Sequence, residues 1–282
     1  MSLCKYFPPD RGFEALSERK LMVTPPKYFN DPFDFSPIIR CQDPAAYALR
    51  LFDDATSSPN YFNAHRADFP MVSDFAKFRE YLNRPTVKTA VLAKLAKGVT
   101  ETDLRTQNAV VDVMSQSFGV ICFAGDAVHP LMWGHYTSRH SGLVIEFRED
   151  DLLFTPPSFL RVDYLDERVI YDASGVPDRA TVELFARRKS SHWAYERESR
   201  LIVPLADAVP FDAPDGVRYF FLPIEPRLIV SVTLGLRADD ELKNKVIEAL
   251  SAPELRHVEL FQIAKDENKF EFHRRPVDVT AR

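Results

Sequence analysis

The sequence predicts an α+β protein whose core is a mixed or antiparallel, split sheet and which carries a mainly helical insertion. Between residues 43 and 118, apolar side chains recur at the three- and four-residue spacing of amphipathic helices. From residue 119 onward, short segments rich in Val, Ile, Phe and Tyr follow one another. These segments outnumber the predicted helices there and do not alternate with them, which favours a mixed or antiparallel sheet over a parallel βαβ array.

The predicted elements follow in order along the chain. The first residues predict a strand at 3–7, a helix at 12–18 and a strand at 21–24, which Pro25 and Pro26 end. Within the insertion, helices are predicted near 44–54, 73–83, 87–97 and 101–117, and the polar, proline-marked stretch 55–70 is predicted to be irregular. The later strands are predicted at 120–124, 142–147, 159–164, 201–205, 219–224, 229–236, 260–264 and 270–272, with helices near 178–194 and 239–250. We expect one elaborated domain spanning 1–282, with 43–118 inserted in it, although a chain of this length also admits two small domains.

The composition argues against several classes of protein. A formal net charge of −5 argues against a broad nucleic-acid-binding surface, which is normally rich in Lys and Arg. With 9 glycines and no G-x-G-x-x-G or P-loop motif, the sequence does not support a glycine-rich phosphate loop. Cys4, Cys41 and Cys122 are too widely spaced for a zinc pattern or a disulfide framework, so we expect reduced thiols. No apolar run approaches the roughly 20 residues of a membrane span, and we expect a cytoplasmic protein with no membrane partner.

The segment W-A-Y-E-R-E-S-R at 193–200 is the strongest local signal for a site. In an extended conformation, Glu196, Glu198 and Arg200 would point to one side of the chain. Two buried carboxylates so placed raise each other's proton affinity, Arg200 restrains that rise, and the group can act as an acid, a base or a cation stabiliser. Trp193 and Tyr195 favour a cleft here. The alternative is a solvated edge strand with alternating charges.

The segment L-M-W-G-H-Y-T-S-R-H at 131–140 is a second polar and aromatic cluster. His135 is a candidate acid or base because its pKa lies where small shifts change its charge. The alternative is a short helix in which Trp133 and Tyr136 fill the core while His135 faces water. The spacing of His135 and His140 does not suit two zinc ligands on one helix face, and we expect no metal.

The segment F-N-D-P-F-D-F at 29–35 combines a turn signal with aromatic side chains. Asn30 and Asp31 before a proline favour a turn, because Asx side chains bond to nearby backbone groups. That structural role is one interpretation. In the other, the aromatic residues around the turn form a stacking wall for a ligand that carries a ring.

At these segments together, the chain resembles a large bacterial family known as domain-of-unknown-function family 2971. The resemblance covers about residues 3–205 and consists of ordered motifs, none of which is specific alone. The matching residues are Lys5-Tyr6, Phe29–Asp34, Cys122-Phe123, Met132–Tyr136, Gly142–Phe147 and Trp193–Arg200. The family has no settled activity, so the resemblance marks positions rather than a reaction.

More distantly, the chain looks like the ADP-ribosyltransferase fold. That fold brings together a first strand with a basic residue or Tyr, a middle strand that opens with hydroxyl or aromatic residues, and a late strand that opens with Glu, often as E-x-E. The corresponding residues here are Lys5-Tyr6, Tyr136-Thr137-Ser138 and Glu196-x-Glu198. The resemblance implies that nicotinamide stacks on aromatic rings while Glu stabilises a ribosyl cation. The first strand lacks the Arg or His that these enzymes commonly carry.

The prediction is therefore an NAD-dependent ADP-ribosyltransferase-like enzyme, with bacterial toxins and defence effectors as the roles that it suggests. The predicted catalytic residues are Glu198, Glu196 and His135, and the predicted binding residues are Lys5, Tyr6, Asn30, Asp31, Trp133, Tyr136, Ser138, Trp193 and Arg200. NAD is the expected cofactor and an aromatic cleft its expected site; a nucleic-acid or protein target stays open. We expect Asp31, His135 and Glu198 to line one cleft.

Two alternatives come from other functional classes. One is a metal-dependent hydrolase or nuclease that uses Asp31, Asp34, His135 and Glu198. The other is a non-catalytic module that senses a ligand or binds a partner. Bound NAD fragments, a metal at the carboxylates, or a cleft filled by its own side chains would separate the three.

Overall fold

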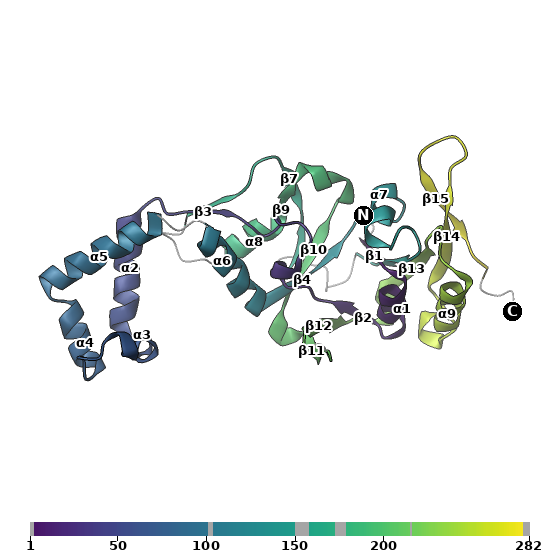
Figure 1. The fold of residues 1–282 in the computed structure, drawn as a ribbon. Helices are drawn as coiled ribbons and strands as arrows, with labels where there is room; N and C mark the ends of the chain where they lie inside the picture. The colour runs from purple at the N-terminus through teal and green to yellow at the C-terminus, as the bar shows by residue number, and fades with distance from the viewer. Residues whose placement is uncertain (1–2, 101–103, 150–157, 173–178, 215, 279–282) are drawn as a thin grey trace. The chain divides into compact units, whose positions relative to one another are not determined.

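The computed structural model describes residues 3–100, 104–149, 158–172, 179–214 and 216–278. The chain divides into two compact units. The sheet unit comprises Met1–Phe35, Val111–Glu167 and Ala186–Arg282, and the helical unit comprises Ser36–Val110 and Arg168–Phe185. Helices occur together with strands in both parallel and antiparallel pairing, which confirms the predicted α+β class (Figure 1). A single folding domain spanning 1–282 stays a prediction.

The largest sheet of the sheet unit has five strands in the order β1-β5-β13-β14-β15. These strands are β1 (Leu3–Phe7), β5 (Leu143–Phe147), β13 (Ile229–Leu234), β14 (Glu259–Lys265) and β15 (Phe272–Pro276). Neighbours are antiparallel except β13 and β14, which are parallel and are joined through α9 (Asp240–Leu250). Helix α1 (Pro9–Ser17) packs beside α9, and the apolar residues of both strands and helices form one core (Figure 1).

A second sheet in the order β4-β10-β6 carries the late glutamates. It consists of β4 (Phe118–Phe123), β10 (Ser199–Pro204) and β6 (Phe159–Arg161). A single bridge between Cys4 and Ala124 joins β1 to the residue that follows β4, through backbone hydrogen bonds of 2.9 and 2.6 Å. The two sheets are therefore tied where Lys5 and the start of β10 come near each other, which is the arrangement of a split sheet.

Smaller elements complete the sheet unit. The strands β11 (Val209–Asp212), β12 (Arg218–Pro223) and β2 (Lys20–Met22) form a third sheet, and β7 (Asp163–Leu165) pairs in parallel with β9 (Arg188–Ser190). The helix α7 (Pro130–Tyr136) and the 3-10 helix η4 (Ser191–Glu196) carry residues of two predicted site segments, and the third segment, 29–35, follows the 3-10 helix η1 (Pro26–Tyr28). Three further 3-10 helices lie at η5 (Leu205–Asp207), η6 (Pro226–Leu228) and η7 (Pro253–Leu255).

The helical unit contains most of the predicted insertion. Its helices are α2 (Pro44–Ser57), α3 (Pro59–Ala64), η2 (Arg66–Asp68), α4 (Phe75–Leu82) and α5 (Pro85–Thr100). The helices α6 (Leu104–Ser117) and α8 (Arg179–Arg187) connect this unit to the sheet unit along the chain. The strands β3 (Ile38–Arg40) and β8 (Ile170–Asp172) pair in parallel. The buried residues Phe52, Phe62, Phe78 and Leu82 form its apolar cluster.

The stretch 55–70, predicted to be irregular, is largely helical. The Ser58 hydroxyl accepts a hydrogen bond from the amide of Asn60, and Pro59 stands at the first position of α3. A capping serine followed by proline is a start signal for a helix, so the residues that suggested a loop begin a new helix.

The predicted helix at 178–194 is shorter, because α8 ends at Arg187. The next residues form β9, which pairs with β7, and then η4. The predicted strand at 159–164 likewise divides into β6 and β7, which pair with different partners. The predicted boundaries are wrong here because pairing with distant strands outweighs the local helical spacing.

No helix within the described residues is long and apolar enough to cross a membrane.

Candidate functional site

The sheet unit contains a cavity of about 400 Å³, here called the site cavity. Its walls come from β1, from the end of β2, from η1 and the turn after it, from β4, from α7, and from β9 and the segment that leads to β10. The lining residues include Lys5, Tyr6, Tyr28, Phe29, Asn30, Asp34, Cys122, Met132, Tyr136, Lys189, Glu196 and Glu198. Its volume lies within the roughly 300–1,000 Å³ typical of small-molecule sites.

A cluster of buried charges forms one wall of the site cavity. This charge cluster consists of Asp34, Lys189, Glu196, Glu198 and Arg200, which are between 0% and 9% exposed. Arg200 donates to both oxygens of Asp34, at 2.9 and 2.6 Å, and its Nε donates to Oε1 of Glu198 at 2.7 Å. Its guanidinium also lies 5.6 and 5.2 Å from the rings of Phe29 and Phe35. The fork of Arg200 therefore ties the turn after η1 to the start of β10.

Lys189 joins the two glutamates. Its Nζ donates to Oε2 of Glu196 at 2.6 Å and to Oε2 of Glu198 at 2.8 Å. Oδ2 of Asp34 lies 3.9 Å away. Burial alone would lower the pKa of Lys189, but the charges of Glu198 and Glu196 outweigh it and raise that pKa well above its usual range. Lys189 is therefore a fixed cation between two carboxylates.

The two glutamates have pKa values that move in opposite directions. Burial raises the pKa of Glu198, but Arg200 and Lys189 outweigh burial and hold that pKa well below its usual range. Burial raises the pKa of Glu196, and the charge of Lys189 offsets only part of that rise. Glu198 is thus ionised at neutral pH, while Glu196 binds a proton more readily than an ordinary glutamate.

Two tyrosines hold the glutamates in place. The Tyr136 hydroxyl donates to Oε1 of Glu196 at 2.7 Å. The Tyr164 hydroxyl accepts a hydrogen bond from the backbone N–H of Glu198 at 2.7 Å, and burial raises the pKa of Tyr164 to about 12. Tyr136 comes from the end of α7, so the middle segment contacts the late segment directly through this bond.

The backbone between the glutamates explains why both face the cavity. Arg197 has a φ of 45° and ends η4 in the left-handed region. The backbone N–H of Gly125 donates to the Glu196 carbonyl at 3.0 Å, and a Cβ on Gly125 would come within 2.6 Å of the Cβ of Arg197. Glu196 and Glu198 both line the site cavity and Arg200 does not, and a turn at Arg197 orients the two glutamates where one continuous extended strand was expected for all three residues.

The first strand contributes Lys5, whose Nζ donates to the Cys122 carbonyl at 3.0 Å. Burial lowers the pKa of Lys5. Tyr6 donates its hydroxyl to the Asp126 carbonyl at 3.0 Å. Burial and the charge of Glu198 raise the pKa of the Cys122 thiol, so this thiol is not an activated nucleophile.

Six of the predicted site residues line the site cavity: Lys5, Tyr6, Asn30, Tyr136, Glu196 and Glu198. Arg200 stands behind the glutamates, fully buried. Trp193 is half-buried, with its ring 5.1 Å from Nζ of Lys189. The convergence of the first, middle and late segments is therefore observed, although fewer residues reach the cavity than the sequence suggests.

The other predicted residues lie outside the lining. Asp31 is buried and its Oδ1 accepts from the amide of Phe33 at 2.9 Å, which is the turn role considered as the alternative. His135 is exposed, with its ring 6.2 Å from that of Tyr136. The expectation that Asp31, His135 and Glu198 line one cleft therefore holds for Glu198 alone.

The middle segment forms a short helix, as its alternative interpretation proposed. Trp133 is fully buried, donates from Nε1 to the Ala127 carbonyl at 2.9 Å and packs edge-on against Tyr6. Ser138 is exposed and has a φ of 49° in the turn after α7. Neither of these two residues lines the site cavity.

Sequence reasoning missed Lys189 and Tyr164 and assigned Asp34 only to the hydrolase alternative. Lys189 lies in β9, within a stretch predicted to be helical. Its spacing to Glu196 along the chain therefore did not predict that the two side chains would pair. The aromatic residues around Asp34 marked the turn, but its pairing with Arg200, 166 residues away, had no local signature.

Among the described residues, no group of three or more His, Cys, Asp or Glu is arranged to hold a metal ion. No protein-family model matches the chain, and no curated protein or solved structure matches it either.

Proposed function

We propose that the site cavity binds NAD and that the protein transfers ADP-ribose from it to an acceptor, with Glu198 as the catalytic carboxylate. The observation that carries the proposal is the convergence of Lys5 and Tyr6, Tyr136, and Glu196 with Glu198 on one cavity. These are the residues that the resemblance to the ADP-ribosyltransferase fold assigns to its three strands.

The opposed pKa values of the glutamates suit the reaction. When the bond between ribose C1′ and the nicotinamide nitrogen breaks, its electron pair goes to nicotinamide and leaves positive charge on the ribose. Glu198, ionised because Arg200 and Lys189 lower its pKa, stabilises that charge. Glu196, whose pKa burial raises, accepts the proton that the acceptor group loses as it bonds to C1′.

The rest of the lining suits a ligand with a ring. Tyr28, Phe29 and Tyr136 supply aromatic surface on which nicotinamide stacks. A charged Lys5 has N–H groups beyond the one bonded to the Cys122 carbonyl, and these can donate to ribose or phosphate oxygens. His135, exposed and outside the lining, has no part in the proposed step.

The test starts with NAD binding by the wild-type chain, measured by calorimetric titration, and with release of nicotinamide. We expect saturable binding and slow release in the absence of an added acceptor. Glu198→Gln keeps the shape of the side chain and removes its charge, so release should fall by about 10²-fold or more while NAD still binds.

Because Glu198 is held by two buried cations, folding of the variant is verified by near-ultraviolet circular dichroism at low temperature. Glu225→Gln is the matched control, since Glu225 is exposed and pairs with neighbouring Arg227 at the surface. If millimolar NAD gives neither binding heat nor thermal stabilisation, the transferase proposal fails and a non-catalytic role for the charge cluster takes its place.

A further inference from the structure

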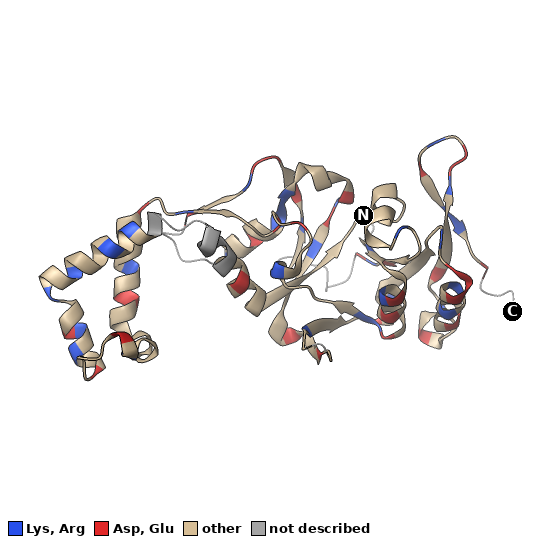
Figure 2. Ribbon diagram, viewed as in Figure 1, with Lys and Arg blue, Asp and Glu red and all other residues tan. Residues whose placement is uncertain are grey.

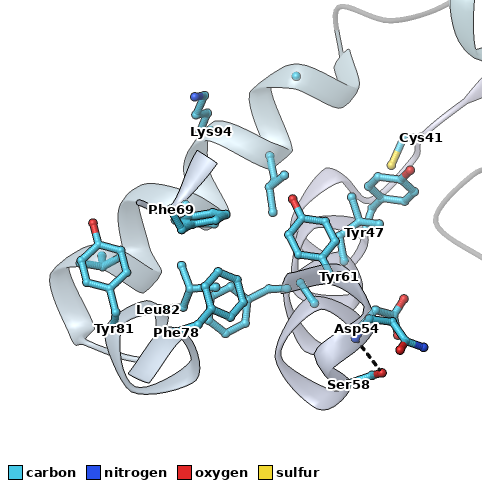
Figure 3. Close-up of a pocket in the computed structure, with 18 of the residues that line it drawn as sticks. Cys41, Tyr47, Asp54, Ser58, Tyr61, Phe69, Phe78, Tyr81, Leu82 and Lys94 are labelled. Atoms are coloured by element: carbon cyan, nitrogen blue, oxygen red, sulfur yellow. Dashed lines mark hydrogen bonds between the residues drawn. The ribbon is translucent and has the colours of Figure 1, made fainter. Parts of the chain in front are cut away.

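The helical unit contains a second and larger cavity, of about 1190 Å³, here called the helical cavity. Its lining comes from β3 and the residues after it and from α2, α3, α4 and α5, together with Phe69 between η2 and α4. Figure 3 shows Tyr61, Phe69, Phe78 and Leu82 directed into the space between these helices. None of its lining residues belongs to the site cavity.

The walls of the helical cavity are apolar. On the α2 and α5 side they are mainly aliphatic, with Leu51, Ala55, Val87, Val91 and Leu95 beside the rings of Tyr47 and Phe52. On the α3 and α4 side they are aromatic, with the ring of Phe78 4.9 Å from that of Phe69 and 6.4 Å from that of Tyr61. Such walls take up a hydrocarbon chain or an apolar ring system.

Many of the apolar side chains around this cavity are incompletely buried, although Phe52, Phe78 and Leu82 are buried. The aliphatic residues on the α2 and α5 side are half-buried, and Tyr61 and Tyr81 on the other side are 43% and 40% exposed. Removing apolar surface from water contributes about 25 cal/mol per Å², so an apolar molecule in the cavity would gain burial on every wall. The described residues of the helical unit therefore leave part of its apolar surface uncovered.

The charges near the cavity favour an anion. Residues 81–100 contain Arg84, Lys88, Lys94 and Lys97 and no Asp or Glu, and Figure 2 shows Lys and Arg along α5. Lys94 and Arg40 line the cavity and are exposed. Within the described part of the chain, neither side chain makes an ion pair or hydrogen bond. The carboxylate that lines the cavity is that of Asp54, from α2.

We propose that the helical cavity binds a small anionic amphiphile, a molecule with a hydrocarbon or ring body and a terminal carboxylate or phosphate. The body lies between the aliphatic wall and the aromatic wall, and the anionic group pairs with Lys94 and Arg40. Binding at this site does not depend on the proposed reaction at the site cavity, since the two cavities share no residue.

The experiment is calorimetric titration of the full chain with three probes that have the same chain length, each below its micelle concentration. Laurate and dodecyl phosphate carry the two anionic groups, and dodecyltrimethylammonium carries a cation. We expect saturable binding of at least one anion, and an affinity for the cation that is at least about tenfold weaker. The stronger of the two anions identifies the head group.

Two variants locate the binding. Val91→Trp places a large ring in the cavity and should weaken binding of the anionic probe at least about tenfold. Lys94→Gln should weaken it by about two- to fivefold, the range of an exposed ion pair. Lys77→Gln on α4 is the matched control, because Lys77 is exposed and does not line the cavity.

Four results would overturn the proposal: no saturable binding of either anion, equal binding of the cation, unchanged binding by Val91→Trp, or unchanged binding by Lys94→Gln. Because Lys94 is an exposed side chain, Lys94→Gln is expected to retain the fold, so its result decides the test even if Val91→Trp does not fold.

Discussion

The charge cluster of the sheet unit and the apolar cluster of the helical unit stabilise their surroundings by opposite means. In the charge cluster, five ionisable side chains are at most 9% exposed and each has a partner within hydrogen-bond distance. In the helical unit, Phe52, Phe62, Phe78 and Leu82 are buried beside a cavity of about 1190 Å³.

The comparison shows two kinds of specificity. Hydrogen bonds and ion pairs depend on direction, so each member of the charge cluster has one geometry that satisfies it. Apolar packing depends on volume and surface and tolerates different occupants. The charge cluster is therefore expected to respond to changes of charge, and the helical unit to changes of volume.

The largest effect is expected from Arg200→Met. This change keeps the apolar bulk but leaves Asp34 and Glu198 buried without the guanidinium that bonds to both. The free energy of unfolding should fall by about 3–5 kcal/mol, measured by urea titration. Arg218→Met, which breaks an exposed pair with Asp212, should leave it unchanged. If both variants lowered the free energy of unfolding equally, the buried charge cluster would contribute no more to stability than a surface ion pair.

The next effect tests the helical unit. Phe78 is fully buried and its ring lies 5.1 Å from that of Phe62 and 4.9 Å from that of Phe69. Phe78→Ala should cost about 3 kcal/mol, at the low end for this substitution, because the adjacent cavity leaves room for relaxation. Hydrogen exchange should accelerate in α2 to α5 and remain slow in β10. Tyr81→Ala, on the exposed side of α4, is the control.

A smaller effect depends on pH. At pH 7, Glu198→Gln should lower the free energy of unfolding by about 2 kcal/mol, since it weakens charged hydrogen bonds from Arg200 and Lys189. The folded-state pKa of Glu198 is depressed, so its contribution is complete above the unfolded pKa, about 4.3, and is lost as pH falls below that value. Denaturation between pH 3 and pH 7 should show the two proteins converging toward low pH. A constant difference across this range would mean that the charge of Glu198 contributes nothing.

The smallest effect is expected from Tyr136→Phe. The hydroxyl donates a hydrogen bond to Glu196 and also interacts with the Asn30 side chain, and Lys189 continues to bond to the Glu196 carboxylate. The loss should be about 1 kcal/mol in thermal unfolding. Tyr219→Phe, a half-buried ring on β12, is a control in the same unit. A loss as large as that for Arg200→Met would show that Tyr136, rather than the guanidinium, organises the cluster.

The sequence by itself determined the elements with strong local periodicity. The strand at 3–7, the strands near 120–124 and 142–147, and the helix near 239–250 agree with β1, β4, β5 and α9 to within two residues at each end. It also indicated that the first, middle and late segments converge, through Lys5, Tyr136 and Glu198. In these segments the residue types alone predicted a shared site.

Only the tertiary structure decided how the charges pair and which aromatic residues face the cavity. Arg200 reaches Asp34 across 166 residues of chain, and Lys189 reaches both glutamates because β9 pairs with β7. Trp133 turns inward because Tyr6, far away in sequence, packs against it. Local spacing cannot encode such contacts, since a buried charge or ring takes its orientation from partners that folding brings from elsewhere in the chain.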